Sequence, residues 1–208
     1  LKLHQEELRV YEALGDTRSR AVTLGDIARI QAARGQIDEA LKLHQEELRV
    51  YEALGDTRFR AVTLGDIAHI QTARGQIDEA LKLHRVRLAI FEALGDADGI
   101  SNACFDLGQL LLMQAVEAAR KEQRDREAFT NALGFLDRAY AGVNRIGRVD
   151  GIAVVATVYG QALAMAGQRD RALEVLAAAR SAYVTLERDD VKELDEVIAR
   201  IRRGPDGA

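Results

Sequence analysis

The chain has 208 residues with a formal net charge of -4, and 48% of them are apolar. This length allows one large domain or two small ones, and the weak negative charge does not favour binding to nucleic acid or to an anionic membrane surface. The single proline leaves little room for turn-rich β structure, the single cysteine excludes an internal disulfide, and no stretch approaches the ~20 uninterrupted apolar residues of a membrane span.

An internal repeat dominates the first half of the chain. Residues 1–40 and 41–80 are nearly identical. Their three differences are Ser19/Phe59, Arg29/His69 and Ala32/Thr72. The motif "GQIDEAL" that begins at Gly35 returns as "GQRDRAL" at Gly167, which lies 132 residues later, or three repeats of 40 residues and 12 residues more. A fixed period of this size is typical of stacked repeat proteins, and the excess predicts an insertion near residues 114–127.

Each repeat is predicted to consist of two helices. Apolar side chains recur at three- and four-residue spacing over residues 17–34 and again over residues 37–54. Gly55 follows the second helix, where a left-handed residue ends a helix at low cost, and Asp16 and Asp56 precede first helices as N-cap acceptors. Neither helix buries its apolar stripe alone, so the pairs are expected to stack.

The predicted elements follow in chain order. An unpaired second helix covers residues 1–14, and four helix pairs span 17–54, 57–94, 97–146 with the insertion, and 149–187. A final amphipathic helix over 190–203 is expected to cap the stack, and residues 204–208 form a tail. We therefore expect residues 1–203 to form a single solenoid of about ten helices.

The sequence resembles the tetratricopeptide repeat family. The residues that carry the resemblance are Leu24, Ile27, Ala28, Gln31, Gly35, Ile37, Ala40 and His44. Leu24 stands where tryptophan is common, and His44 stands where an aromatic residue is common. The 40-residue period resembles the longer-helix branch of kinesin light chains and of large bacterial signalling proteins of the STAND type. Over about residues 1–187, the resemblance implies an all-α fold: a right-handed α-solenoid of antiparallel helix pairs whose first helices line a concave groove.

The positions that the resemblance places on the groove form the candidate partner-binding site. They are Asp26, Arg29, Asp66, His69, Asn102, Phe105, Asp106, Gln109, Leu112, Met113, Val154, Val158, Gln161 and Met165. A row of Asp26, Asp66 and Asp106 would lead into an apolar stretch, and Gly25 and Gly65 would leave room for a partner's backbone. Apolar groove residues suit a helix or peptide ligand. The alternative is that the extended third pair covers them.

The resemblance also suggests what the partner is not. Chaperone-binding members of the family hold a C-terminal carboxylate with lysine, asparagine and arginine, but the matching places here include Asp66 and Asp106. We hypothesise instead a partner segment with basic or amide groups followed by apolar anchors.

No catalytic, metal or cofactor site is predicted. His4, His44 and His84 recur at one repeat position, but stacked helices lie ~8–10 Å apart and Zn–N bonds measure ~2.0–2.1 Å, so these histidines are assigned to packing. Cys104 falls at the place of Leu24, which favours a buried structural thiol. The basic cluster of Arg200, Arg202 and Arg203 fits a solvated helix end better than a nucleic-acid patch.

The leading functional prediction is a cytoplasmic, non-enzymatic scaffold that binds a protein or peptide, as the repeat segment of a larger bacterial signalling or regulatory protein. One alternative is self-association through the unpaired helix at residues 1–14. Another is an accessory sensor for an enzyme whose catalytic domain lies outside this chain. The charged insertion is either a solvated projection or a further partner contact.

Overall fold

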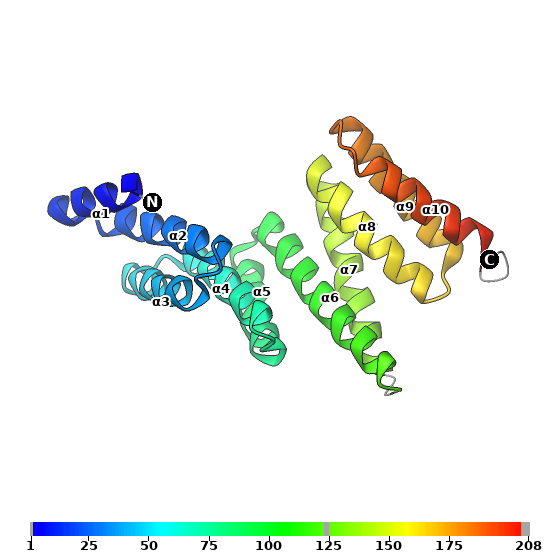
Figure 1. Ribbon diagram of the computed structural model, residues 1–208, viewed down its shortest axis with the longest axis horizontal. Helices are drawn as coiled ribbons and strands as arrows, with labels where there is room; N and C mark the ends of the chain where they lie inside the picture. Colours follow the sequence, from blue (N-terminus) through cyan, green and yellow to red (C-terminus); the bar gives the residue numbers. More distant parts are fainter. Residues whose placement is uncertain (1, 123–124, 205–208) are drawn as a thin grey trace. The chain divides into compact units, whose positions relative to one another are not determined.

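The computed structural model describes residues 2–122 and 125–204, and all the regular structure in these ranges is helical (Figure 1). The ten helices are α1 (Lys2–Leu14), α2 (Thr17–Ala33), α3 (Ile37–Leu54), α4 (Thr57–Ala73), α5 (Ile77–Leu94), α6 (Ala97–Arg120), α7 (Arg126–Ile146), α8 (Val149–Met165), α9 (Arg169–Thr185) and α10 (Val191–Arg203). The all-α fold class with a terminal helix after four pairs is confirmed. Leu1, part of the predicted insertion and most of the predicted tail lie outside the described residues.

The ends of the helices follow from local chemistry. Asp16 and Asp56 accept hydrogen bonds from the backbone N–H groups three residues later, as N-cap residues do. Gly55 ends α3 with a φ of 66°, in the left-handed region that favours glycine. The start and stop signals expected at these positions are confirmed.

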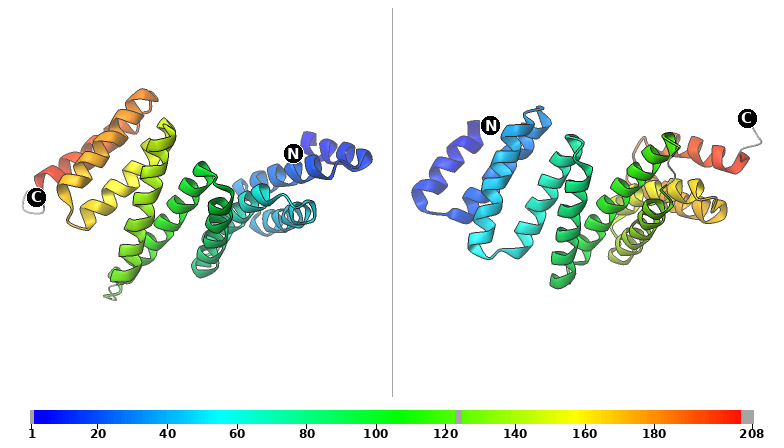
Figure 2. Two further views of the ribbon diagram at one scale, coloured as in Figure 1. Left: turned by 180° about the vertical axis from the view of Figure 1, so that it is seen from behind. Right: turned by 90° about the horizontal axis from the view of Figure 1, so that it is seen from below.

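The chain divides into two compact units, Leu1–Gly95 and Asp96–Ala208. In the first unit, α2 pairs with α3 and α4 pairs with α5, and the two hairpins pack through α3 and α4 (Figure 2). Small residues such as Ala28 and Ala40 are fully buried where paired helices approach one another. Helix α1 packs on α2, but none of its residues is buried.

The second unit contains the pairs α6/α7 and α8/α9 and the final helix α10. Leu194 and Ile198 of α10 are buried against this unit's core. On the polar side, the Arg180 guanidinium of α9 donates hydrogen bonds of 2.6 and 3.0 Å to the carboxylate of Asp195. Helix α6 has 24 residues and α7 has 21, whereas α8 and α9 have 17 each, so the third pair is longer than the fourth.

The apolar surfaces of the helices are used for packing against one another. Cys104 is buried in α6, as its repeat position predicted. Among the described residues, no helix combines the length and the apolar character needed to cross a bilayer.

Candidate functional site

The two glycines expected to admit a partner's backbone are instead occupied by the chain's own side chains. Gly25 and Gly65 are buried in α2 and α4. A Cβ at Gly25 would lie 2.6 Å from Oε1 of Glu47, and a Cβ at Gly65 would lie 3.0 Å from the guanidinium of Arg87. These glycines therefore make room for the second helix of their own hairpin, and the expectation of space for a partner is wrong at both positions.

A buried polar pair fills the space at Gly25. Nδ1 of His44 lies 2.8 Å from Oε2 of Glu47, one turn later on α3, and both residues are buried. His44 and His84 are both buried, which agrees with the packing role predicted for them. His4, their counterpart on α1, lies near the surface and bonds to Glu7.

Arg29 connects two members of the predicted acidic row. Its guanidinium donates a hydrogen bond of 2.7 Å to Asp26 on its own helix and one of 3.1 Å to Asp66 on α4. Burial alone would lower the pKa of Arg29, but the hydrogen bond to Asp26 and the charges of both aspartates outweigh it and raise the pKa. The three side chains together therefore carry a net charge of about -1 at neutral pH. Asp106 belongs to α6, so the row predicted from the sequence is divided between the two units.

A cavity of about 250 Å³ lies between the two hairpins of the first unit. We call it the inner cavity, and its lining residues are Arg29, Ala32, Ile37, His44, Asp66, His69, Ile70 and Ala73. It brings together three of the predicted site residues, Arg29, Asp66 and His69, and adds the buried His44. The rings of His69 and His84 meet edge to face nearby, with centroids 5.3 Å apart. The walls are otherwise aliphatic, so charged groups border an apolar space.

A second cavity, of about 290 Å³, lies within the second unit and includes the predicted residues Asn102, Phe105 and Val154. Arg148 also lines it and forms ion pairs with Asp98 and Asp150. The hydrogen bonds to these carboxylates raise the pKa of Arg148. This polar rim was not predicted, because Arg148 lies in a connection between hairpins.

The remaining predicted residues of the second unit are divided between core and surface. Leu112 and Val158, like Phe105, pack against the core of this unit. Gln109, Met113, Gln161 and Met165 are exposed. The apolar stretch therefore combines residues that pack against the core with residues that are exposed.

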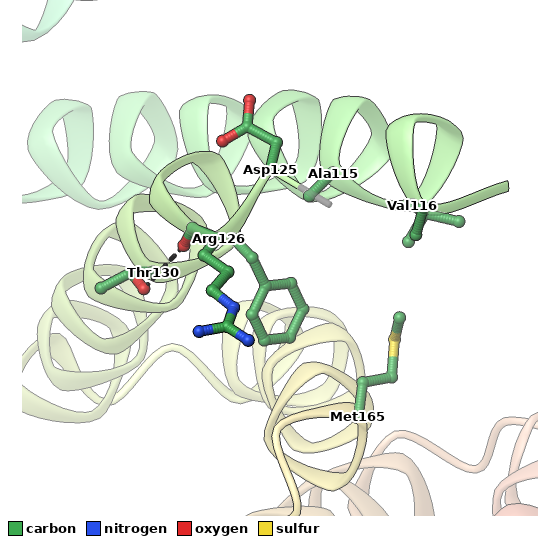
Figure 3. A pocket seen from close by; sticks show the side chains of 8 residues that line it. Ala115, Val116, Asp125, Arg126, Thr130 and Met165 are labelled. Atoms are coloured by element: carbon green, nitrogen blue, oxygen red, sulfur yellow. Dashed lines mark hydrogen bonds between the residues drawn. The ribbon is translucent and has the colours of Figure 1, made fainter. Parts of the chain in front are cut away.

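A third cavity, of about 450 Å³, lies at the tip of the long α6/α7 hairpin. Ala115, Val116, Ala119, Asp125, Arg126, Phe129, Thr130 and Met165 line it (Figure 3). Only Met165 was among the predicted site residues. The predicted insertion near residues 114–127 was the signal for the lining residues between Ala115 and Arg126, whereas Phe129 and Thr130 lie just beyond it.

Comparison with known proteins agrees with this architecture. The model of the tetratricopeptide repeat family matches residues 19–93, and no curated protein matches the chain. The fold is similar to that of nearly identical TPR-like repeats assigned to a kinesin light chain of Podosopora anserina, with 17% identity and a TM-score of 0.60 over 92% of this chain and 99% of that one. BtubC (BKLC) from P. vanneervenii has 16% identity and a TM-score of 0.62, over 98% of this chain and 88% of that one.

A further structure with this fold is YrrB, described as a TPR protein with an unusual peptide-binding site. It has 17% identity and a TM-score of 0.51, over 93% of this chain and 92% of that one. At such low identity these likenesses concern the fold alone. The repeats of residues 19–93 therefore belong to the tetratricopeptide repeat family, and the chain as a whole has the TPR-like fold of packed helical hairpins.

Proposed function

We propose that this chain is a protein-binding scaffold that holds a segment of a partner protein on the inner faces of its first helices. The tetratricopeptide repeat fold is typically a non-catalytic scaffold, and helical hairpins that pack side by side leave one face of each first helix for a ligand. The proposed site contains the residues expected from the sequence, with the inner cavity as its centre in the first unit.

The inner cavity is the observation that carries this proposal. Residues 1–40 and 41–80 differ at three positions, and Arg29, Ala32 and His69 from two of these positions line the cavity. The positions that build the hairpins are identical in both copies. Variation concentrated at a cavity, on an otherwise repeated framework, supports a role in selecting a ligand.

The chemistry of the cavity favours a basic or amide side chain with a long apolar stem. Arg29 neutralises only one of the charges of Asp26 and Asp66, so a negative charge stays at the rim. Ile37 and Ile70 offer aliphatic walls to a methylene chain, as lysine and arginine stems require. Further apolar anchors would follow along the partner segment.

Selection from a display library of random peptides against the 208-residue chain tests the proposal. We expect enriched peptides to carry a basic residue next to apolar residues, and Asp66→Lys to weaken their binding by at least about tenfold, since it reverses the charge that faces the ligand. Glu39→Lys is the matched control, because Glu39 lies on α3 outside the cavity and is exposed. Equal binding by the Asp66 and Glu39 variants would contradict the proposal.

Self-association is a second candidate function, favoured by the surface of α1. Leu3 and Leu14 are 75% and 72% exposed, which is high for leucines on a helix that packs against another. A second copy of the chain would cover them in an oligomer. Light scattering over a concentration series tests this, and a constant monomer mass would reject it.

A further inference from the structure

The long hairpin of the second unit builds a cavity that an ordinary repeat would lack. Ala115, Val116 and Ala119 lie in the last turns of α6, and Phe129 lies in the first turns of α7. Met165 closes the cavity from the end of α8 (Figure 3). We refer to this space, of about 450 Å³, as the tip cavity. It belongs wholly to the second unit and shares no residue with the inner cavity.

The walls of the tip cavity are apolar and reachable from solvent. Met165 is 57% exposed, although it faces the apolar ends of the long hairpin. Methionine is flexible and polarisable, so it adapts to ligands of different shape. The volume also lies within the range of ~300–1,000 Å³ that is usual for ligand sites. A bulky apolar side chain therefore has room to enter.

The charge at the rim determines which apolar segment would fit. The carboxylate of Asp125 is already engaged as the N-cap of α7, where it accepts a 2.8 Å hydrogen bond from the N–H of Ala128. In Figure 3 the Arg126 guanidinium points away from this carboxylate. Within residues 2–122 and 125–204, no carboxylate forms an ion pair with Arg126. Asp125 and Glu127 already face the partial positive charge at the N-terminus of α7, so the Arg126 guanidinium is the group at this rim that is left for a carboxylate of a ligand.

We propose that the tip cavity is a docking site for an acidic segment of a partner protein that inserts one bulky apolar side chain. The apolar anchor would pack against Val116, Phe129 and Met165, and a carboxylate next to it in the segment would pair with Arg126. The chain as a whole carries a net charge of -4, so a general electrostatic attraction would favour basic segments. A preference for an acidic segment would therefore have to come from this rim.

Three acetylated and amidated peptides separate the contributions of the anchor and of the charge. They are Glu-Glu-Phe-Glu-Glu, Lys-Lys-Phe-Lys-Lys and Glu-Glu-Ala-Glu-Glu. The chain has only two methionines, Met113 and Met165, so ¹³C-methyl labelling of methionine gives one signal in the tip cavity and one internal reference outside it. The titrations are followed by NMR at low salt, where charge pairing is least screened.

We expect the acidic phenylalanine peptide to shift the Met165 signal and to bind about fivefold more tightly than the basic one, as one exposed ion pair allows. The alanine peptide should leave the Met165 signal in place. Absence of binding by the acidic phenylalanine peptide would overturn the proposal. So would equal binding by the basic peptide, or an equal shift with the alanine peptide.

Two variants and a control assign the effect to the cavity. Arg126→Glu should remove the preference for the acidic peptide, and Ala119→Phe should fill the cavity and abolish the Met165 shift. Arg145→Glu makes the same charge change at the other end of α7 and should behave as the parent chain does. Circular dichroism checks that each variant is folded. If Arg126→Glu keeps the acidic preference, or if Ala119→Phe leaves the Met165 response intact, the site is not the tip cavity.

Discussion

Tyr51 and Phe91 occupy the same place in successive repeats, and both rings are almost completely buried. The Tyr51 ring stacks on Phe59, with centroids 5.2 Å apart. Its hydroxyl is buried, and within the described residues it has no hydrogen-bond partner. Burial, and next the charge of Glu47, raise the pKa of Tyr51 to about 12. The buried hydroxyl therefore lowers the stability of the folded chain, and the next repeat lacks this effect because it has phenylalanine at the same place.

We predict that Tyr51→Phe raises the free energy of unfolding at pH 7 by about 1 kcal/mol, because an unpaired buried polar group is removed. The phenol of an unfolded chain titrates near ~10, so the folded state keeps a proton that the unfolded state loses. The parent chain should therefore lose stability as the pH rises from 10 towards 12, and the variant should lose less. Urea titrations at pH 7 and pH 11 measure both effects. A less stable variant at pH 7, or an unchanged gap at pH 11, would refute this explanation.

At the level of single residues, the repeat pattern predicts which positions are buried better than it predicts which side chains are in contact. His44 and Cys104 were assigned to the interior from their repeat positions, and both are buried. Glu47 was not assigned to the interior, because a glutamate on a helix is normally solvated. Its burial is explained by its contacts with Gly25 and His44. The pairing of Arg29 with Asp66 was also missed, since it depends on how neighbouring hairpins pack.

The helical elements depend on small residues where two helices cross. Gly108 of α6 is buried, and a Cβ there would lie 2.7 Å from Cγ of Leu136 on α7. Gly134 of α7 is different, because a Cβ there would meet nothing within 4 Å. Gly108 is therefore required by the close packing of α6 on α7, whereas Gly134 only carries the general cost of a glycine within a helix.

We predict opposite effects of alanine at these two sites. Gly134→Ala should stabilise the chain by about 0.5–1 kcal/mol, because the unfolded chain loses conformational freedom. Gly108→Ala has the same benefit but forces Leu136 to move, which typically costs about 1–3 kcal/mol, so we expect a net loss of stability. Denaturant unfolding of both variants measures the difference. Equal stabilisation by both would show that α6 and α7 are not closely packed at Gly108.

The helices themselves are the part of the structure that the sequence predicts best. Periodicity, capping aspartates and terminating glycines act within a few residues, so they locate helices such as α2 and α4 without knowledge of tertiary structure. The cavities were beyond this kind of reasoning. The inner cavity needs the distance between two hairpins, and the tip cavity needs Met165 to lie beside the end of α6, which is 45 residues away at Arg120.

For the molecule as a whole, the stability of each helix depends on the helices packed against it. Helix α1 has the sequence of residues 42–54 of α3, position by position. Tyr51 and His44 are buried in α3, which packs against both α2 and α4, whereas none of the residues of α1 is buried. The same sequence therefore exists in two environments within one chain, and intrinsic helix propensity is the same in both.

Amide hydrogen exchange, resolved residue by residue by NMR, compares these two segments directly. We predict that amides of α1 exchange at least about a hundredfold faster than those of residues 42–54, because isolated or half-covered helices of this length are marginal in water. The sample is dilute, so that self-association does not protect the α1 amides from exchange. Protection of α1 that rises with protein concentration would support the proposed oligomer. Equal protection of the two segments in dilute solution would contradict the claim that packing between hairpins holds this fold together.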